Sequence, residues 1–218
     1  MATPHHPPGQ IYYSEEDGNV SESTKHYMQG THLFEALHAF FAARPDVFVG
    51  GNLFVYYREG APKECFSPDV MVALGLRPRP VEERGSYRTW EEGVPPTVII
   101  ELTSISTQRD DTVRKPHLYA TLGVREYYLF DPLGEFLVPR LQGYHLDAQG
   151  QYERAPGNEL DSPALGLRLV VRDGWLRLLD PTTGALLPTR EEQQAALAAA
   201  EAEIARLRAE LMRRQESP

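Results

Sequence analysis

The pattern of apolar and polar positions predicts one long helix followed by short strands. Apolar side chains recur at helical spacing from Lys25 to Ala43, and Arg44-Pro45 ends that pattern. Two runs rich in β-forming residues follow, VFVGGNLFVYY (47–57) and DVMVAL (69–74). The second predicts a single apolar strand, whereas the first fits either a hairpin or a bulged strand.

The most regular segment spans residues 97–131. TVIIEL (97–102) is apolar up to its glutamate, as expected of a strand that is buried on both faces. A turn rich in Ser and Thr, a helical stretch that ends at Gly123 and a second apolar run, EYYLFD (126–131), come next. Short links between strand, helix and strand imply a right-handed crossover between two parallel strands.

The remainder of the chain predicts further strands and then a helical tail. Gly, Pro and Asp separate short β-like runs between residues 136 and 180, which predicts antiparallel strands that extend the same sheet. From Glu191 the composition changes to Ala, Glu, Arg and Leu, and Leu197, Ile204 and Leu211 lie seven residues apart. This heptad spacing predicts a helix that either forms a coiled coil or packs on the body.

The charge distribution divides the chain into three parts. The formal net charge is −9, which argues against a uniformly basic nucleic-acid-binding surface. Residues 1–22 carry −4, residues 191–218 carry −2, and residues 23–190 carry only −3. We therefore predict an acidic N-terminal arm (1–22), a main domain (23–190) and a helical tail (191–218). Any contact with nucleic acid is expected to be local, through a few arginines.

Several classes of protein are excluded by simple counts and missing motifs. A single cysteine, Cys65, excludes a disulfide framework and a multi-cysteine zinc site. No run approaches the roughly 18–20 apolar residues of a membrane span, so no membrane partner is expected. The start, MATPHHPPGQ, lacks the regions of a signal peptide, which makes the cytoplasm the expected compartment. GxxxxGK[ST], GxSxG and HExxH motifs do not occur.

Three positions carry candidate chemistry. Asp69 opens an apolar strand and Glu101 ends one. Lys115 follows fourteen residues later, with Tyr119 one turn further along the same helix face. The carboxyl ends of central strands are where α/β sheets build sites, and two carboxylates there suit a hard cation such as Mg²⁺. The alternatives are a turn role for Asp69 and a purely structural salt bridge between Glu101 and Lys115.

These positions belong to a series of motifs that carries a family resemblance. The series reads SPDVMV (67–72), VIIELTSIST (98–107) and KPHLYATLGVREYYLFDP (115–132). In this order, the motifs resemble the Uma-type putative restriction endonuclease family of the PD-(D/E)XK nuclease superfamily. The resemblance implies an α/β fold with a restriction endonuclease-like mixed β-sheet core flanked by helices. The sequence adds a coiled-coil-like C-terminal helix.

The resemblance also implies an activity, the metal-dependent hydrolysis of phosphodiester bonds in DNA. Mg²⁺ (or Mn²⁺) would be held by the Asp69 and Glu101 carboxylates and by the main-chain carbonyl of Leu102. Two other functions stay open on the same fold. One is a catalytically inactive, dimeric interaction module, and the other is a hydrolase of a small phosphorylated ligand. The helical tail makes a homodimer the expected assembly.

The catalytic lysine departs from the parent motif. There it stands two residues after the glutamate, where this chain has Thr103. In this family the lysine lies in the following helix, and the resemblance therefore assigns its role to Lys115. Pro116 disfavours helical geometry at the residue before it, so the helix is expected to begin at Pro116.

Looser matches add auxiliary residues. Similar proteins carry a Glu and a His near the first helix, matched here to Glu22 and His26, with capping or solvent exposure as alternatives. Ser104 either positions the substrate or caps the next helix, and Tyr119 is a further auxiliary candidate. Candidates for phosphate contacts are Arg77, Arg79, Arg84, Arg88, Arg109 and Arg114. Pairing of these arginines with nearby acids is the alternative.

Overall fold

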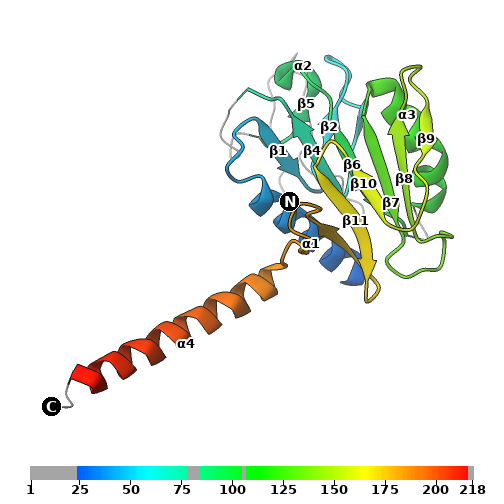
Figure 1. Cartoon of the computed structure of the whole chain (residues 1–218). Helices are drawn as coiled ribbons and strands as arrows, with labels where there is room; N and C mark the ends of the chain where they lie inside the picture. The colour runs from blue at the N-terminus through cyan, green and yellow to red at the C-terminus, as the bar shows by residue number, and fades with distance from the viewer. Residues whose placement is uncertain (1–23, 78–83, 105–106, 216–218) are drawn as a thin grey trace, which may run out of the picture.

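A six-stranded sheet forms the centre of the computed structural model, which describes residues 24–77, 84–104 and 107–215 (Figure 1). Its strand order is β1-β4-β6-β7-β8-β9. The strands are β1 (Val47–Gly50), β4 (Val70–Leu74), β6 (Val98–Leu102), β7 (Glu126–Phe130), β8 (Leu141–Leu146) and β9 (Tyr152–Arg154). β6 and β7 run parallel on either side of the predicted helical crossover, and the other neighbours are antiparallel. The mixed sheet of the predicted α/β fold is confirmed.

Two three-stranded sheets accompany the central one. The first contains β2 (Val55–Tyr56), β3 (Cys65–Phe66) and β5 (Tyr87–Arg88), and the second contains β10 (Leu160–Ser162), β11 (Leu167–Arg172) and β12 (Trp175–Leu179). The prediction that all strands between residues 136 and 180 extend one sheet is therefore wrong. β8 and β9 extend the central sheet. β10, β11 and β12 form a separate sheet, whose apolar side chains cover one face of the central sheet.

Residues 47–57 form neither a hairpin nor a bulged strand. The chain leaves the central sheet after β1 and enters a different sheet at β2. At the exit, the Asn52 N–H donates to the Pro68 carbonyl, and Asn52 takes the left-handed φ of 48°. A Cβ on the preceding Gly51 would lie 3.3 Å from the Asp69 carbonyl oxygen, so a larger residue would press against the backbone just before β4. The turn separates β1 from β2.

The described residues contain the helices α1 (Thr24–Phe40), α2 (Thr89–Glu92), the π-helix η2 (Asp110–Arg114), α3 (Lys115–Leu122) and α4 (Arg190–Gln215). Of these, α1 and α3 cover opposite faces of the central sheet. One face packs against α1 and the β10–β12 sheet, through residues such as Leu33 and Ile100. The other packs against α3 and the β2–β3–β5 sheet, through residues such as Tyr119 and Ile99. Successive β6 residues thus enter opposite cores, which explains why the strand is apolar throughout.

The helix before β7 starts earlier than Pro116. Lys115 has helical dihedral angles, φ −60° and ψ −45°, and its N–H donates to the Asp110 carbonyl, five residues back. Pro116 has no N–H to donate, and the wider turn accommodates this gap within a continuous helix. The prediction that the helix begins at Pro116 is therefore wrong. Gly123 ends α3 with the left-handed φ of 81°, as predicted.

After β7, the chain is organised by one buried carboxylate. Asp131 is fully buried and accepts backbone N–H bonds from Leu133, Gly134, Phe136 and Leu137. These four donors hold the pKa of Asp131 below its ordinary value, although burial alone would raise it. Because the N–H groups of residues 136 and 137 are bonded to Asp131, they do not pair with a neighbouring strand, and the β-like run predicted there does not form.

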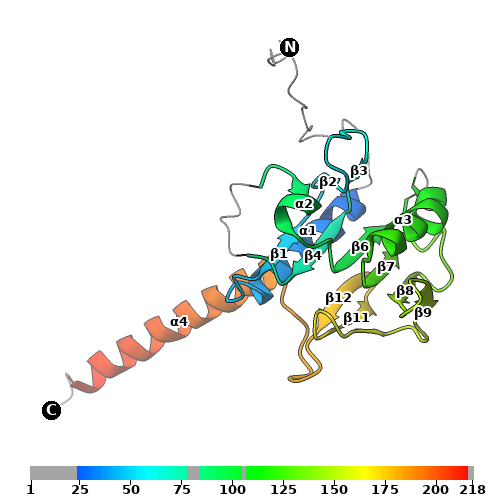
Figure 2. The same cartoon turned by 90° about the horizontal axis from the view of Figure 1, so that it is seen from above.

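The C-terminal helix α4 projects away from the body, as Figures 1 and 2 show. Leu197 and Leu211 are each 61% exposed, so the alternative in which this helix packs along the body is wrong. None of the helices in the described ranges is long and apolar enough to cross a membrane. The acidic arm (1–22) lies outside the described residues, and the domain boundaries at residues 22 and 190 stay predictions.

Candidate active site

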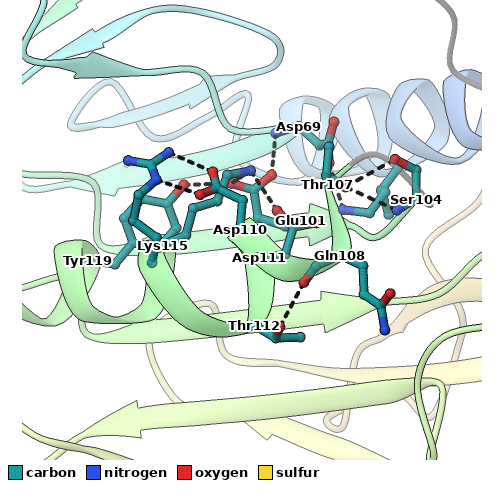
Figure 3. Close-up of polar contacts among 12 residues, drawn as sticks. Asp69, Glu101, Ser104, Thr107, Gln108, Asp110, Asp111, Thr112, Lys115 and Tyr119 are labelled. Atoms are coloured by element: carbon teal, nitrogen blue, oxygen red, sulfur yellow. Dashed lines mark hydrogen bonds and ion pairs between the residues drawn. The ribbon is translucent and has the colours of Figure 1, made fainter.

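Two strand ends bring the predicted carboxylates together. β4 and β6 are antiparallel with Val70 opposite Ile100, which places Asp69 beside the end of β6 that carries Glu101 (Figure 3). The Asp69 N–H donates to Glu101 Oε2 at 3.4 Å, and the Leu102 N–H donates to Asp69 Oδ2 at 2.6 Å. The main chain of β6 therefore fixes the Asp69 carboxylate.

The crossover helix supplies the positively charged side chain of the site, that of Lys115. Lys115 Nζ lies 3.0 Å from Glu101 Oε1 and 2.8 Å from Asp111 Oδ1. One turn on, the Tyr119 hydroxyl donates to Glu101 Oε1 at 2.6 Å. The structure thus brings Asp69, Glu101, Lys115 and Tyr119 into one cluster, in which a single Glu101 oxygen accepts from both helix residues.

Asp111 is a member of this cluster that sequence reasoning missed. It is 1% exposed, faces Lys115 and stands next to Asp110, whose carboxylate turns outward to Arg114 at 2.6 Å. Two adjacent acids in a polar stretch resemble a solvated helix face. The signal that could have found Asp111 is its spacing of four residues from Lys115, since such residues share a helix face.

His26 joins the site from the first helix. It lies on α1 and is 3% exposed, and its Nε2 is 3.1 Å from Asp69 Oδ1. The loose match in the sequence therefore falls on a residue that contacts the cluster. Glu22, matched in the same way, lies outside the described residues.

Comparison with known proteins identifies the family. A family model for Uma2, described as a putative restriction endonuclease, matches residues 7–181. The chain belongs to the Uma2 family. Among solved structures, it is similar to a putative nuclease belonging to DUF820 from Anabaena variabilis, with 13% identity and a TM-score of 0.47 over 66% of this chain and 75% of that one. No curated protein matches the chain.

Burial dominates the electrostatics of the site in this Uma2-family protein. The Glu101 carboxylate is 1% exposed, and burial raises its pKa to about 8; the Asp69 and Asp111 charges add to the rise, whereas Lys115 and the Tyr119 hydroxyl oppose it. Burial also raises the pKa of Asp111. Burial lowers the pKa of Lys115, but the nearby Glu101 and Asp111 carboxylates have the larger effect and raise this pKa overall. The cluster contains three carboxyl groups, Asp69, Glu101 and Asp111, and one ammonium, Lys115.

The donor set fits a divalent cation. Among the described residues, no group of three or more His, Cys, Asp and Glu side chains is arranged so that it could hold a metal ion. Mg²⁺ does not require such a group, since it is usually bound through one or two carboxylates, with waters and substrate phosphates completing its shell. Asp69 and Glu101 offer hard oxygen atoms, and burial, which raises the pKa of Glu101, would be opposed by a cation bound beside it.

Other predicted residues have more ordinary surroundings. The Ser104 N–H donates to Thr107 Oγ1 at 3.1 Å, and the Ser104 carbonyl accepts the Gln108 N–H. These bonds belong to the turn that begins the crossover helix. Both bonds use the main chain of Ser104, so its side-chain roles as a helix cap and as a substrate contact stay predictions.

The predicted arginines that the structure describes have different surroundings. The prediction is wrong for Arg84, whose side chain is 4% exposed and pairs with the equally buried Glu92, because a buried guanidinium cannot reach a DNA backbone. Arg88 pairs with Glu91, and Arg114 pairs with Asp110. Arg77 and Arg109 are exposed. Arg79 lies outside the described residues.

Proposed function

We propose that this Uma2-family protein is a divalent-cation-dependent endonuclease that hydrolyses phosphodiester bonds in DNA by the PD-(D/E)XK mechanism. The observation that carries the proposal is the buried Glu101 carboxylate with its raised pKa, beside two further carboxylates and one ammonium. A purely structural ion pair would match one acid to one base, whereas here three carboxyl groups surround one ammonium at a strand end. Membership of a family described as putative restriction endonucleases gives independent support.

Each residue then has a defined task. Asp69 and Glu101 would hold Mg²⁺ or Mn²⁺, with the Leu102 carbonyl as a further candidate ligand. When bound, the cation polarises a phosphate oxygen and lowers the pKa of a coordinated water. Lys115, held between Glu101 and Asp111, presents its ammonium to the water or to the developing negative charge. Tyr119 orients the Glu101 carboxylate, and His26 orients that of Asp69.

DNA is the substrate that the family description favours, and the protein would contact it locally. Arg109 is exposed on the helical segment that also carries Asp111 and Lys115. With a net charge of −9, binding is expected to be weak and to depend strongly on salt concentration.

The test is cleavage of plasmid and single-stranded DNA in Mg²⁺ or Mn²⁺ by variants that keep the shape of each side chain. Asp69→Asn, Glu101→Gln and Lys115→Met should each lower the rate by at least about 100-fold. Asp110→Asn is the matched control, because it neutralises a neighbouring acid that faces Arg114 instead of the site. Its rate should stay within about threefold of the wild-type rate.

Two outcomes would overturn the proposal. Cation binding without cleavage of any nucleic acid would favour the inactive interaction module. Turnover of a nucleotide or a simple phosphoester, with polymeric DNA left intact, would instead identify a hydrolase of a small phosphorylated ligand.

A further inference from the structure

The first turn of α4 is fixed firmly to the body. Thr189 and Glu192 cap each other, since the Thr189 N–H donates to Glu192 Oε2 and the Glu192 N–H donates to Thr189 Oγ1. Arg177 on β12 donates two hydrogen bonds to the Glu192 carboxylate. Arg190 pairs with Glu35 on α1. The helix therefore leaves the body in a defined direction.

Beyond this anchor, α4 exposes an apolar stripe. Leu197, Ile204, Leu207 and Leu211 are 61%, 49%, 50% and 61% exposed, and Ala200 completes the series. The spacing alternates between three and four residues, so the stripe occupies the a and d positions of a heptad repeat. A solvated helix has no need of apolar side chains concentrated on one face, whereas a paired helix buries them.

The flanking charges indicate which partner fits. With Leu197 at a, Glu203 takes a g position and Arg208 the following e position. In two parallel, in-register copies, g of one helix faces that e of the other, which brings Glu203 of each copy beside Arg208 of its partner. An antiparallel pair would instead set g against g, and Glu203 and Glu210 would repel. Among the described residues, Arg208 has no ion pair within its own chain.

We propose that α4 is a dimerisation helix that pairs in parallel with α4 of a second copy of this chain. Ile204 at an a position followed by Leu207 at d is the combination typical of two-stranded parallel coiled coils. Because each helix is anchored at its first turn, parallel pairing places both bodies at the same end of the coil. This assembly does not depend on the proposed nuclease activity.

Light scattering coupled to size-exclusion chromatography tests the existence of the dimer. The full chain should elute with twice the mass of the 24.6 kDa monomer. Ile204→Glu should raise the dimer dissociation constant at least about 100-fold, while the melting temperature of the body stays unchanged. Ala202→Glu introduces the same charge on the opposite face and should remain a dimer. The proposal would be overturned by a wild-type chain that is still monomeric at subunit concentrations up to about 100 µM. An Ile204→Glu variant that remains a dimer would overturn it as well.

Cysteine crosslinking tests the orientation. In a Cys65→Ser background, Ala200→Cys should form an intermolecular disulfide on oxidation, because d positions of parallel helices face each other. Ala202→Cys, two residues away on the outer face, should not. Equal crosslinking of both variants, or none at position 200 in a proven dimer, would contradict parallel pairing.

Discussion

Replacing Glu101 by Gln should stabilise the cation-free protein at alkaline pH while abolishing cleavage. The folded state raises the pKa of Glu101 from 4.5 to about 8. Below pH 4.5 the carboxyl is protonated in both the folded and the unfolded chain, so its ionisation does not change the free energy of unfolding there. Between pH 4.5 and 8 the unfolded chain releases the proton first. The free energy of unfolding therefore falls as the pH rises through this window.

The size of the effect follows from the same interval. At about 1.36 kcal/mol per pH unit, the interval from 4.5 to 8 corresponds to a loss of about 5 kcal/mol in wild type. Gln has nearly the same shape but does not ionise, so the variant avoids this loss. The attraction of Lys115 is already part of the Glu101 pKa of about 8, so it is not subtracted a second time. We expect Glu101→Gln to be more stable than wild type by about 4 kcal/mol at pH 8, and to lie within about 1 kcal/mol of it at pH 5.

Urea unfolding at several pH values, with and without Mg²⁺, measures both parts of this prediction. A cation at 100 times its dissociation constant should stabilise wild type by about 2.7 kcal/mol at pH 8 and the variant much less. A variant less stable than wild type at pH 8 would show that Glu101 and Lys115 form a structural ion pair. An equal response of both proteins to Mg²⁺ would place the cation elsewhere.

Three further substitutions test neighbouring contacts. Lys115→Met leaves two buried carboxylates without their ammonium and should cost about 3–5 kcal/mol at pH 8, measured by urea unfolding; an unchanged stability would contradict the buried pairing. Tyr119→Phe removes a hydrogen bond that lowers the pKa of Glu101, so the pH window of stability loss should move upward, at a cost of about 1 kcal/mol. A downward shift would refute this reading. Asp131→Asn should cost about 2 kcal/mol at pH 7, and the difference should vanish as the pH falls through the lowered pKa of Asp131, since protonation then weakens the wild-type bonds as well. A difference that persists at pH 2 in a still folded protein would argue against the ionised carboxylate as the cause.

The sequence predicted the centre of the fold because its signals there are local. An apolar strand with Glu101 next to its end, a helix that ends at Gly123 and short links determine a parallel pair almost without regard to the rest of the chain. Asp69 and Glu101 were expected at strand ends, and antiparallel pairing of β4 with β6 brings them together. Their catalytic roles stay predictions.

The choice of sheet could not be predicted in the same way. Apolar alternation identifies a strand, but it does not say which neighbour completes the hydrogen bonds. The runs after residue 136 illustrate this, because β8 pairs with β7 whereas β11 pairs with β10 and β12. Burial of Asp111 was also hard to predict, because its spacing from Lys115 gives only a shared helix face, and the direction of that face depends on the turn that precedes the helix.

The π-helical turn at Asp110–Arg114 has a consequence for how this helix tolerates changes in length. Each residue of an α-helix turns the chain by about 100°, so deleting one residue between Asp111 and Lys115 would rotate the lysine away from Glu101. The same deletion would place Pro116 in a regular turn that it cannot complete. The four-residue interval from Asp111 to Lys115, with Pro116 after it, is therefore fixed. Homologous chains that keep this architecture should vary in length on either side of this interval and hold it constant.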